Sequence, residues 1–502
     1  MKKKRRVLFF SVASIALCGI IYELLISVVA SYVLGDSILY FSLTIGLFLF
    51  FMGVGSYLSR FFSNENILSS FIYVETVIAL AGGLSATVLF MLHAFGSFFF
   101  VGYLSLVAII GICTGLEIPL VTRILDQRKE KESELSGVLT FDYLGALVGA
   151  IIFPLVLLPV LGLQVTAIII GIVNATIALV SLKVLLKGED VLRLKVLVAL
   201  TIMILLAVLA VQSPLERLIN NRIFQGEVIL HERSLYQDIV FTQTKAGNIN
   251  LYLNRKLQFS TLDEHRYHEA IVHVPVSLYG MPEEVLIIGG GDGLALREIL
   301  KYDSVQQVTM IDLDKQLINM MQEDSRLRDI TDGAYSDPRV KLIFGDAFVE
   351  VQKLQQSFDM VIIDLPDPYT PALGKMYTKE FYGYIGRVLD EEGIIVTQAS
   401  SPYLARESFW NTVGTLESEY DFVTPYNIFM PTFGTWGFVL ASNNPPAPSD
   451  VEIPDDLRYF SQVIMNSLLL FDNDMSRISS PINRLTNQIN VQLYQDSFKQ
   501  WD

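Results

Sequence analysis

Aspartates follow successive apolar runs in the second half of this 502-residue chain. Asp292, Asp312, Asp346 and Asp364 each stand at or shortly beyond the end of such a run, and Asp367 follows three residues after the last. If the runs are parallel strands, their carboxyl ends meet in one crevice, where these carboxylates would attract a cationic group. Any one of them alone could instead cap the next helix, but four in register make capping a poor explanation for the set.

The run from Val285 to Leu300, VLIIGGGDGLALREIL, predicts a buried strand, a glycine turn and a helix. Glycines let the backbone approach a ligand closely, and the first N–H groups of the helix face the same place. Asp292 would repel the pyrophosphate of a dinucleotide, so we expect an adenosine-like ligand that is cationic or neutral at this point. The glycines of the turn are Gly289, Gly290, Gly291 and Gly293.

Two further acids are placed to hold the rest of such a ligand. Asp312 lies 20 residues beyond Asp292, where a strand-end carboxylate commonly accepts hydrogen bonds from both hydroxyls of a ribose. Asp346 precedes Ala347 after the third strand, where it can meet an adenine edge.

Alternating strands and helices are expected to position these residues. The pattern is typical of an α/β Rossmann-like, methyltransferase-type fold with a doubly wound sheet, and its strands are predicted at 285–288, 307–311, 340–343, 360–363 and 394–398. A small β-hairpin layer precedes it, at 228–230, 238–244 and 248–254. We predict four regions: a transmembrane domain at 1–212, a small β domain at 213–280, a catalytic domain at 281–445 and a polar C-terminal tail at 446–502.

The ordered motifs resemble the polyamine aminopropyltransferases, of which spermidine synthase is the best known. The resemblance covers residues 225–440 and depends on LDEHRYHE at 262–269, the glycine turn, DPRV at 337–340, GDA at 345–347 and FDMVIIDLPDP at 358–368. The glycine turn alone is a weak signal, whereas its combination with Tyr267, His268 and the Asp-x-x-Asp-Pro element is specific. Multi-spanning membrane forms of this family occur in bacteria, and this chain looks like one.

The resemblance implies transfer of an aminopropyl group from decarboxylated S-adenosylmethionine, a co-substrate, to an amine such as putrescine, giving spermidine and methylthioadenosine. It implies that Asp364 accepts the proton of the amine and that Tyr267 and Asp367 hold this amine. No separate cofactor is implied, and homodimers or homotetramers are usual for the family. The nucleoside and its aminopropyl arm would be surrounded by Gln237, His268, Asp292, Asp312, Asp346, Ala347 and Pro371.

Physical chemistry supports this assignment. Ordinary S-adenosylmethionine would bring its carboxylate against Asp292 or Asp364, at a cost on the order of several kcal/mol in a partly dry site. The acids therefore select the decarboxylated donor. The acceptor amine has a pKa of about 10 and must lose a proton before it attacks the carbon next to sulfur.

Two positions depart from the family pattern and leave the identity of the amine open. Leu294 follows the glycine turn where a small residue is common, and Leu365 and Pro366 replace the usual small polar pair of the Asp-x-x-Asp-Pro element. His265, His268 and His273 could suggest a metal site, but no fourth ligand is apparent and we expect no metal.

Residues 1–212 are expected to form a transmembrane helical bundle of a multi-pass cell-membrane protein. A crossing needs roughly 20 apolar residues, and seven stretches qualify: 7–29, 38–58, 67–92, 98–121, 138–161, 165–186 and 196–212. Residues 1–6, 59–66, 122–137 and 183–195 are basic, whereas the connections between them contain no Lys or Arg, so the N-terminus is predicted to be cytoplasmic. Seven crossings would place the enzyme outside, away from an intracellular substrate. Either one segment does not cross or the chemistry is external.

Four acids lie inside the predicted spans, namely Glu23, Glu75, Glu117 and Asp142. A charge in hydrocarbon is costly, so such residues usually face the bundle interior or a polar cavity. Hydrogen bonding between helices and a path or site for a cation both stay open as explanations.

The distribution of charge separates the two halves. Residues 1–212 carry a net charge of +2 and residues 213–502 a net charge of −17, which disfavours nucleic acid as a partner of the soluble half and suits a cationic substrate. The only cysteines, Cys18 and Cys113, lie in apolar spans, so they do not report the redox compartment.

Two other functions compete with aminopropyl transfer. An S-adenosylmethionine-dependent methyltransferase would share the parallel sheet and the nucleoside pocket, although Asp292 and the Tyr267-His268 pair argue against it. A polyamine transporter or sensor that binds without turnover would instead explain the acids within the spans.

Overall fold

The computed structural model describes residues 2–34, 37–96, 98–126, 133–185, 191–446 and 451–499. The chain divides into two compact units, Met1–Val228 and Ile229–Asp502. Parts of the basic connections used for the predicted orientation, at 127–132 and 186–190, lie outside the described residues, as do 447–450 of the linker before the C-terminal tail.

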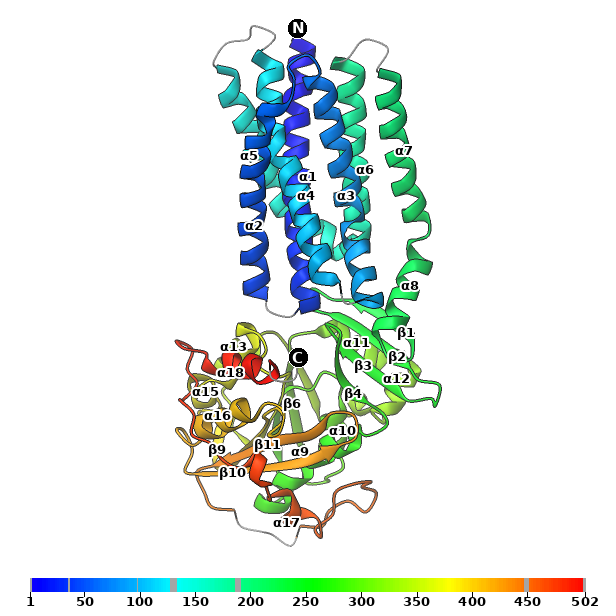
Figure 1. Ribbon diagram of the computed structural model, residues 1–502. Coiled ribbons are helices and arrows are strands. Elements are labelled where there is room, and N and C mark those ends of the chain that lie inside the picture. Colours follow the sequence, from blue (N-terminus) through cyan, green and yellow to red (C-terminus); the bar gives the residue numbers. More distant parts are fainter. Residues whose placement is uncertain are drawn as a thin grey trace. The chain divides into compact units, whose positions relative to one another are not determined.

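Long helices make up the first unit (Figure 1). They are α1 (Lys2–Leu34), α2 (Ser37–Leu58), α3 (Ile67–Phe95), α4 (Phe99–Asp126), α5 (Ser133–Ile152), α6 (Leu158–Leu185), α7 (Val191–Ala210) and α8 (Gln212–Ile223), with a 3-10 turn η1 (Ser59–Phe61) and a π-helical turn η2 (Phe153–Leu157).

Six helices among the described residues are long and apolar enough to cross a membrane. The fifth, Ser136–Val184, has 49 residues and would be about 74 Å long if straight, more than twice the hydrocarbon thickness of roughly 30 Å. It is broken at Gly162, whose φ of 70° is not helical, and α5 and α6 run in opposite directions (Figure 1). This one segment therefore contains both the fifth and the sixth predicted spans.

Glycines allow the helices of the first unit to approach closely. A Cβ on Gly115 of α4 would lie 2.1 Å from the carbonyl oxygen of Met52 in α2, and one on Gly145 of α5 would lie 1.9 Å from that of Ala13 in α1. Any larger residue would force these backbones apart. In the same bundle, α1 and α3 contact each other, and both contact α4 and α6.

A four-stranded sheet opens the second unit. Its strands are β1 (Glu227–Arg233), β2 (Asp238–Gln243), β3 (Ile249–Leu253) and β4 (Lys256–Ser260), in that order, with β2, β3 and β4 antiparallel. The hairpin layer was predicted, but β4 was not. Asn254 and Arg255 form its turn with positive φ angles of 49° and 67°, and Arg255 is not a residue type that signals this conformation.

A seven-stranded sheet forms the centre of the second unit in the order β10-β11-β9-β8-β5-β6-β7. Five strands are parallel, which confirms the α/β prediction: β5 (Glu284–Gly289), β6 (Gln307–Asp312), β7 (Val340–Phe344), β8 (Phe358–Asp364) and β9 (Leu389–Gln398). An antiparallel hairpin forms one edge of the sheet, with strands β10 (Phe422–Met430) and β11 (Gly434–Ser442). The strand order reverses between β5 and β8, and ligand crevices form at such points.

Helices cover both faces of this sheet. Val285 and Ile287 of β5 are buried in one core and Leu286 and Ile288 in another, as expected for a strand between two helical layers. The helices are α9 (Glu264–Tyr279), α10 (Leu294–Ile299), α11 (Lys315–Glu323), α12 (Ser325–Ile330), α13 (Ala347–Glu350), α14 (Pro371–Gly374), α15 (Lys379–Gly386) and α16 (Arg406–Leu416).

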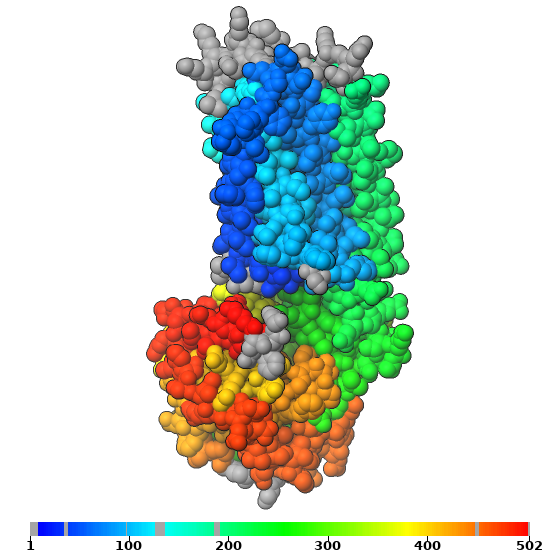
Figure 2. Space-filling view, in the orientation of Figure 1, coloured from blue at the N-terminus to red at the C-terminus, as the bar shows by residue number. Residues whose placement is uncertain are grey.

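The C-terminal segment packs on this fold. Figure 2 shows residues 451–499, in orange-red and red, spread across the surface of the second unit. They include α17 (Met465–Leu468) and α18 (Ile489–Phe498). The buried Asn490 of α18 donates to Thr412 at 3.0 Å and accepts from Ser408 at 2.6 Å, so α18 is fixed to α16.

Candidate active site

The glycine turn lies against the end of β8. The backbone N–H of Gly290 donates to the carbonyl of Asp364 at 2.9 Å. A Cβ on Gly289, whose φ is +79°, would lie 2.2 Å from the same oxygen. Gly293, with φ of +78°, precedes α10. Glycine is therefore needed for both the turn and the close approach of two strand ends.

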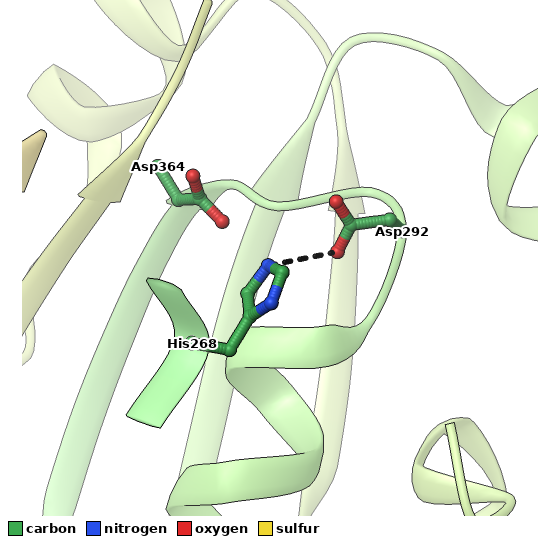
Figure 3. Close-up of side chains that lie close together, drawn as sticks. All are labelled: His268, Asp292 and Asp364. Carbon is green, nitrogen blue, oxygen red and sulfur yellow. Dashed lines mark ion pairs between the residues drawn. The ribbon is translucent and has the colours of Figure 1, made fainter. Parts of the chain in front are cut away.

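Three side chains from distant parts of the sequence converge beside this turn. His268 from α9, Asp292 from the turn and Asp364 from the end of β8 point toward one another (Figure 3), and one polar atom from each lies within 4.8 Å of the others. The His268 Nε2 is 4.0 Å from an Asp292 oxygen. Two carboxylates here face a space that a cationic group can occupy.

His268 is held in one orientation by Glu264. Its Nδ1 lies 2.8 Å from the backbone carbonyl of Glu264 and 2.9 Å from the carboxylate, and Arg297 binds that carboxylate in turn at 3.0 Å. Burial opposes a charge on the ring, but the Glu264 hydrogen bond and the charges of Asp292, Glu264 and Asp364 raise the pKa of His268 to about 9. The ring is therefore protonated at neutral pH.

Asp364 accepts a hydrogen bond from Tyr267. The Tyr267 hydroxyl lies 2.7 Å from Asp364 Oδ1. Burial and the neighbouring Asp292 raise the pKa of Asp364 to about 6, against the opposite effects of His268 and Tyr267. Asp364 is thus mostly ionised at neutral pH and is a stronger base than an exposed aspartate, which suits proton acceptance.

Asp312 and Gln237 are both hydrogen-bonded to Asp314 on another wall of the cavity. Asp312 Oδ1 accepts from the backbone N–H of Asp314 at 2.7 Å, and Gln237 donates to Asp314 Oδ2 at 2.8 Å. Burial and the charges of Asp314 and Asp292 raise the pKa of Asp312 to about 7. Asp314 was not among the predicted site residues, because an aspartate directly before a helix is typical of an N-cap. Asp314 is also the N-cap of α11.

Asp346 both caps a helix and faces the cavity. It accepts from the N–H of Phe348 at the start of α13, at 3.1 Å, and forms an ion pair with Lys375. The capping alternative is therefore correct for Asp346, but the carboxylate and the neighbouring Ala347 also line the cavity.

Asp367 lines the same cavity as Asp364. Ser400 donates to its Oδ1 at 2.6 Å, and the Tyr494 hydroxyl from α18 also bonds to its carboxylate. Burial raises the pKa of Asp367, although the nearby Lys256 acts in the opposite direction. The Lys256 ammonium lies 3.4 Å from the centre of the Tyr369 ring.

These groups line one cavity of about 640 Å³ within the second unit. It is large enough for an adenosine derivative together with an alkyl chain. Of the predicted site residues, Gln237, Tyr267, His268, Asp292, Asp312, Asp346, Ala347, Asp364 and Asp367 line it, with Gly289, Gly290 and Gly291.

Other lining residues escaped the sequence prediction. Lys256 comes from the unpredicted strand β4, and Tyr494 and Phe498 come from the C-terminal helix. Pro371 is not among the lining residues: it begins α14, and its neighbours Ala372 and Leu373 line the cavity instead.

The three histidines considered as metal ligands do not gather at one point. His273 is buried elsewhere, 2.6 Å from the Tyr302 hydroxyl and 3.1 Å from Glu298. His268 lies with Asp292 and Asp364 instead. A metal ion at His268, Asp292 and Asp364 would have to displace the proton of His268, because a histidine ligand is neutral.

Comparison with known proteins identifies the family. The spermine/spermidine synthase domain model matches residues 264–450. The chain is 39% identical over 490 residues to a polyamine aminopropyltransferase of Leptospira interrogans, covering 97% of each chain. It is 39% identical over 514 residues to polyamine aminopropyltransferase 2 of Ralstonia nicotianae, covering 99% of each. The chain belongs to the polyamine aminopropyltransferase family. A crystal structure of spermidine synthase in complex with the transition state analogue AdoDATO is 27% identical, with a TM-score of 0.46, and covers 53% of this chain and 88% of that one.

The departures of this aminopropyltransferase from the family pattern have different consequences. Leu294 is fully buried with Ile239 and Phe241 in the core between the four-stranded sheet and helices α10, α11 and α12. Leu365 and Pro366 line the cavity between Asp364 and Asp367. Of the two departures, only the replacement by Leu365 and Pro366 changes the surface of the cavity.

Proposed function

We propose that this enzyme transfers the aminopropyl group of decarboxylated S-adenosylmethionine to an amine such as putrescine, giving spermidine and methylthioadenosine. The observation that carries the proposal is the convergence of His268, Asp292 and Asp364 within 4.8 Å, with the Tyr267 hydroxyl on Asp364. This arrangement supports a role for Asp364 as a base next to the positively charged sulfonium of the donor.

The donor would lie along the wall formed by the strand ends. Asp312 would accept hydrogen bonds from the ribose hydroxyls, and Asp346 would meet the adenine edge. Asp292 would face the aminopropyl ammonium and the sulfonium, and would repel the carboxylate of intact S-adenosylmethionine. This selection distinguishes the enzyme from a methyltransferase.

The acceptor would lie between Asp364 and Asp367. Its reacting amine gives a proton to Asp364, and the nitrogen lone pair forms a bond to the propyl carbon next to sulfur. The carbon–sulfur bond breaks, and its electron pair neutralises the sulfonium, which leaves as the thioether of methylthioadenosine. Tyr267 would orient Asp364, and Asp367 would hold the distal ammonium of the acceptor. Alignment of nitrogen, carbon and sulfur would supply the rest of the acceleration.

The helical unit would hold the enzyme in a lipid bilayer, with the basic N-terminus on the cytoplasmic side. We further propose that the protein acts as a homodimer or homotetramer. The proposed reaction requires no metal. Asp364 would accept the proton of the amine, and Asp292 would face the positive charges of the donor.

Incubation of the purified full-length protein with each donor tests the proposal. Decarboxylated S-adenosylmethionine and a panel of diamines and triamines should give aminopropylated products and methylthioadenosine, identified by mass. Intact S-adenosylmethionine should give no methylated product. Methyl transfer without use of the decarboxylated donor would contradict the proposal, and binding of amines without any product would favour a sensor or transporter.

A further inference from the structure

The helical unit contains two buried acids that aminopropyl transfer does not use. Glu75 of α3 has no exposed surface and Glu117 of α4 is 6% exposed. The sequence offers no internal counter-charge, because the only Lys and Arg residues between positions 7 and 182 are Arg60, Arg123, Arg128, Lys129 and Lys131, at the ends of spans or between them. Two uncompensated carboxyls in an apolar interior need an explanation.

Oxygen atoms near these acids have no partner. Among the described residues, the Tyr22 hydroxyl, the Thr114 hydroxyl and the Asn174 side-chain oxygen have no hydrogen-bond partner, and the Glu75 carboxyl interacts with the Asn174 side chain. Several other hydroxyls of the bundle are satisfied locally, as when Thr76 donates to the Ile72 carbonyl at 2.7 Å, although the buried Thr87 hydroxyl also lacks a partner among the described residues. Unsatisfied buried polar groups are rare in folded proteins and often mark an absent water or ion.

The helices that carry these oxygens contact one another. The Asn174 amide of α6 donates to the backbone carbonyl of Glu75 at 3.3 Å. A Cβ on Gly19 of α1 would lie 3.9 Å from the Thr114 hydroxyl. Glu117 interacts electrostatically with both Glu75 and Tyr22. The cluster therefore draws on α1, α3, α4 and α6.

The chemistry of the cluster selects a cation. Every unpartnered atom is an oxygen, and carboxylate, amide and hydroxyl oxygens are ligands for hard cations and acceptors for ammonium groups. An anion would be repelled by both acids. A divalent ion such as Mg²⁺ keeps several waters, which a packed helical interior does not supply.

We propose that Glu75, Glu117, Tyr22, Thr114 and Asn174 form a binding site for one monovalent cation inside the helical unit, either an alkali metal ion or the ammonium group of an amine. The site is separate from aminopropyl transfer and does not depend on that proposal. Bound cation would join the four helices and stabilise their packing.

The two cysteines provide a local probe for this site. Cys18 of α1 and Cys113 of α4 are the only thiols of the chain, so a thiol-reactive fluorophore reports unfolding of the helical unit alone. Full-length protein in detergent would be heated with NaCl, KCl, methylammonium chloride or putrescine dihydrochloride, each compared with choline chloride at equal ionic strength. At saturation we expect the unfolding midpoint to rise by about 5 °C. The salts that produce the shift identify the cation.

Variants separate this site from a general salt effect. Glu75→Gln and Glu117→Gln should lose the shift, while Glu65→Gln, a matched change of an exposed acid, should keep it. Thr114→Val preserves shape and both acids, and should raise the half-saturating concentration several-fold even if the glutamine variants fold poorly. An equal midpoint in all salts, or a shift retained by Glu75→Gln or unchanged in Thr114→Val, would overturn the proposal.

Discussion

Asp364 ends β8 and Asp367 lies three residues further along the chain, and their different partners suit the different roles proposed for them. Asp364 faces Tyr267 and the His268 ring, close to the expected reacting carbon. Asp367 instead bonds Ser400 and the Tyr494 hydroxyl of α18. The first is suited to accept a proton and the second to hold a distant ammonium group.

Replacement of the base tests the first role. Asp364→Asn keeps the shape of the side chain but cannot accept the amine proton, so we expect kcat to fall by roughly 10²- to 10⁴-fold. The rate of methylthioadenosine formation measures this loss. Asp390→Asn, on the exposed part of β9, should change kcat less than twofold, and a similarly small effect at Asp364 would exclude it as the base.

The pH dependence follows from the two raised pKa values. Asp364, with a pKa of about 6, becomes protonated as the pH falls and can then no longer accept a proton. His268, with a pKa of about 9, keeps its charge up to that value. When donor and acceptor are both saturating, protonation of Asp312, whose pKa is about 7, no longer limits donor binding, so kcat should fall about tenfold per pH unit below pH 6. This acid limb should be absent from the residual activity of Asp364→Asn.

Metal chelation tests whether His268, Asp292 and Asp364 act without a metal ion. Because the proposed reaction uses no metal, dialysis against EDTA should leave the initial rate unchanged. Loss of activity that returns with added metal would show that His268, Asp292 and Asp364 form a metal centre instead.

At the scale of elements, the C-terminal helix α18 shapes the acceptor end of the cavity. Tyr494 and Phe498 line it, and Gln495 donates to the carbonyl of Tyr369 at 3.1 Å. Residues of α14 on the following loop pack against α18 at the same place. A segment distant in sequence thus positions the loop that carries the acceptor wall.

Adding one methyl group between α14 and α18 tests whether α18 positions the acceptor loop. A Cβ on Gly374 of α14 would lie 2.2 Å from a methyl carbon of Val491 in α18, so Gly374→Ala should displace α18 and raise KM for the acceptor several-fold. The double variant Gly374→Ala/Val491→Ala should restore most of the affinity. Gly414→Ala in α16, where a Cβ meets nothing within 4 Å, serves as the control. Equal KM values for all three variants would show that α18 does not shape the acceptor site.

At the scale of the whole molecule, charge is distributed unevenly along the chain. All Lys and Arg of residues 1–212 fall at the N-terminus or in three connections, and the described beginning of α1 and the end of α7 lie at opposite ends of the helical bundle (Figure 1). The positive-inside tendency therefore favours a cytoplasmic N-terminus, with residues after α7 emerging on the other side.

Protease digestion of intact cells and of inverted vesicles tests this topology. A tag at the N-terminus should be cut only in inverted vesicles, and a tag at the C-terminus only in intact cells. Cleavage of both tags from one side would show that one helical segment does not cross, and would place the enzyme with its intracellular substrate.

The sequence determined the strands and the acids at their ends, because apolar runs and glycine turns are local signals and parallel strands bring their carboxyl ends together. It therefore predicted Asp292, Asp312, Asp346 and Asp364 as neighbours. Tertiary structure alone decided which outside elements complete the cavity, such as Lys256 from β4 and Tyr494 from α18. Neither residue carries a local signal, since each reaches the site through packing between segments distant in the chain. The same reason explains Glu75: its charge in a span was visible, but the unpartnered oxygens near it depend on how four helices meet.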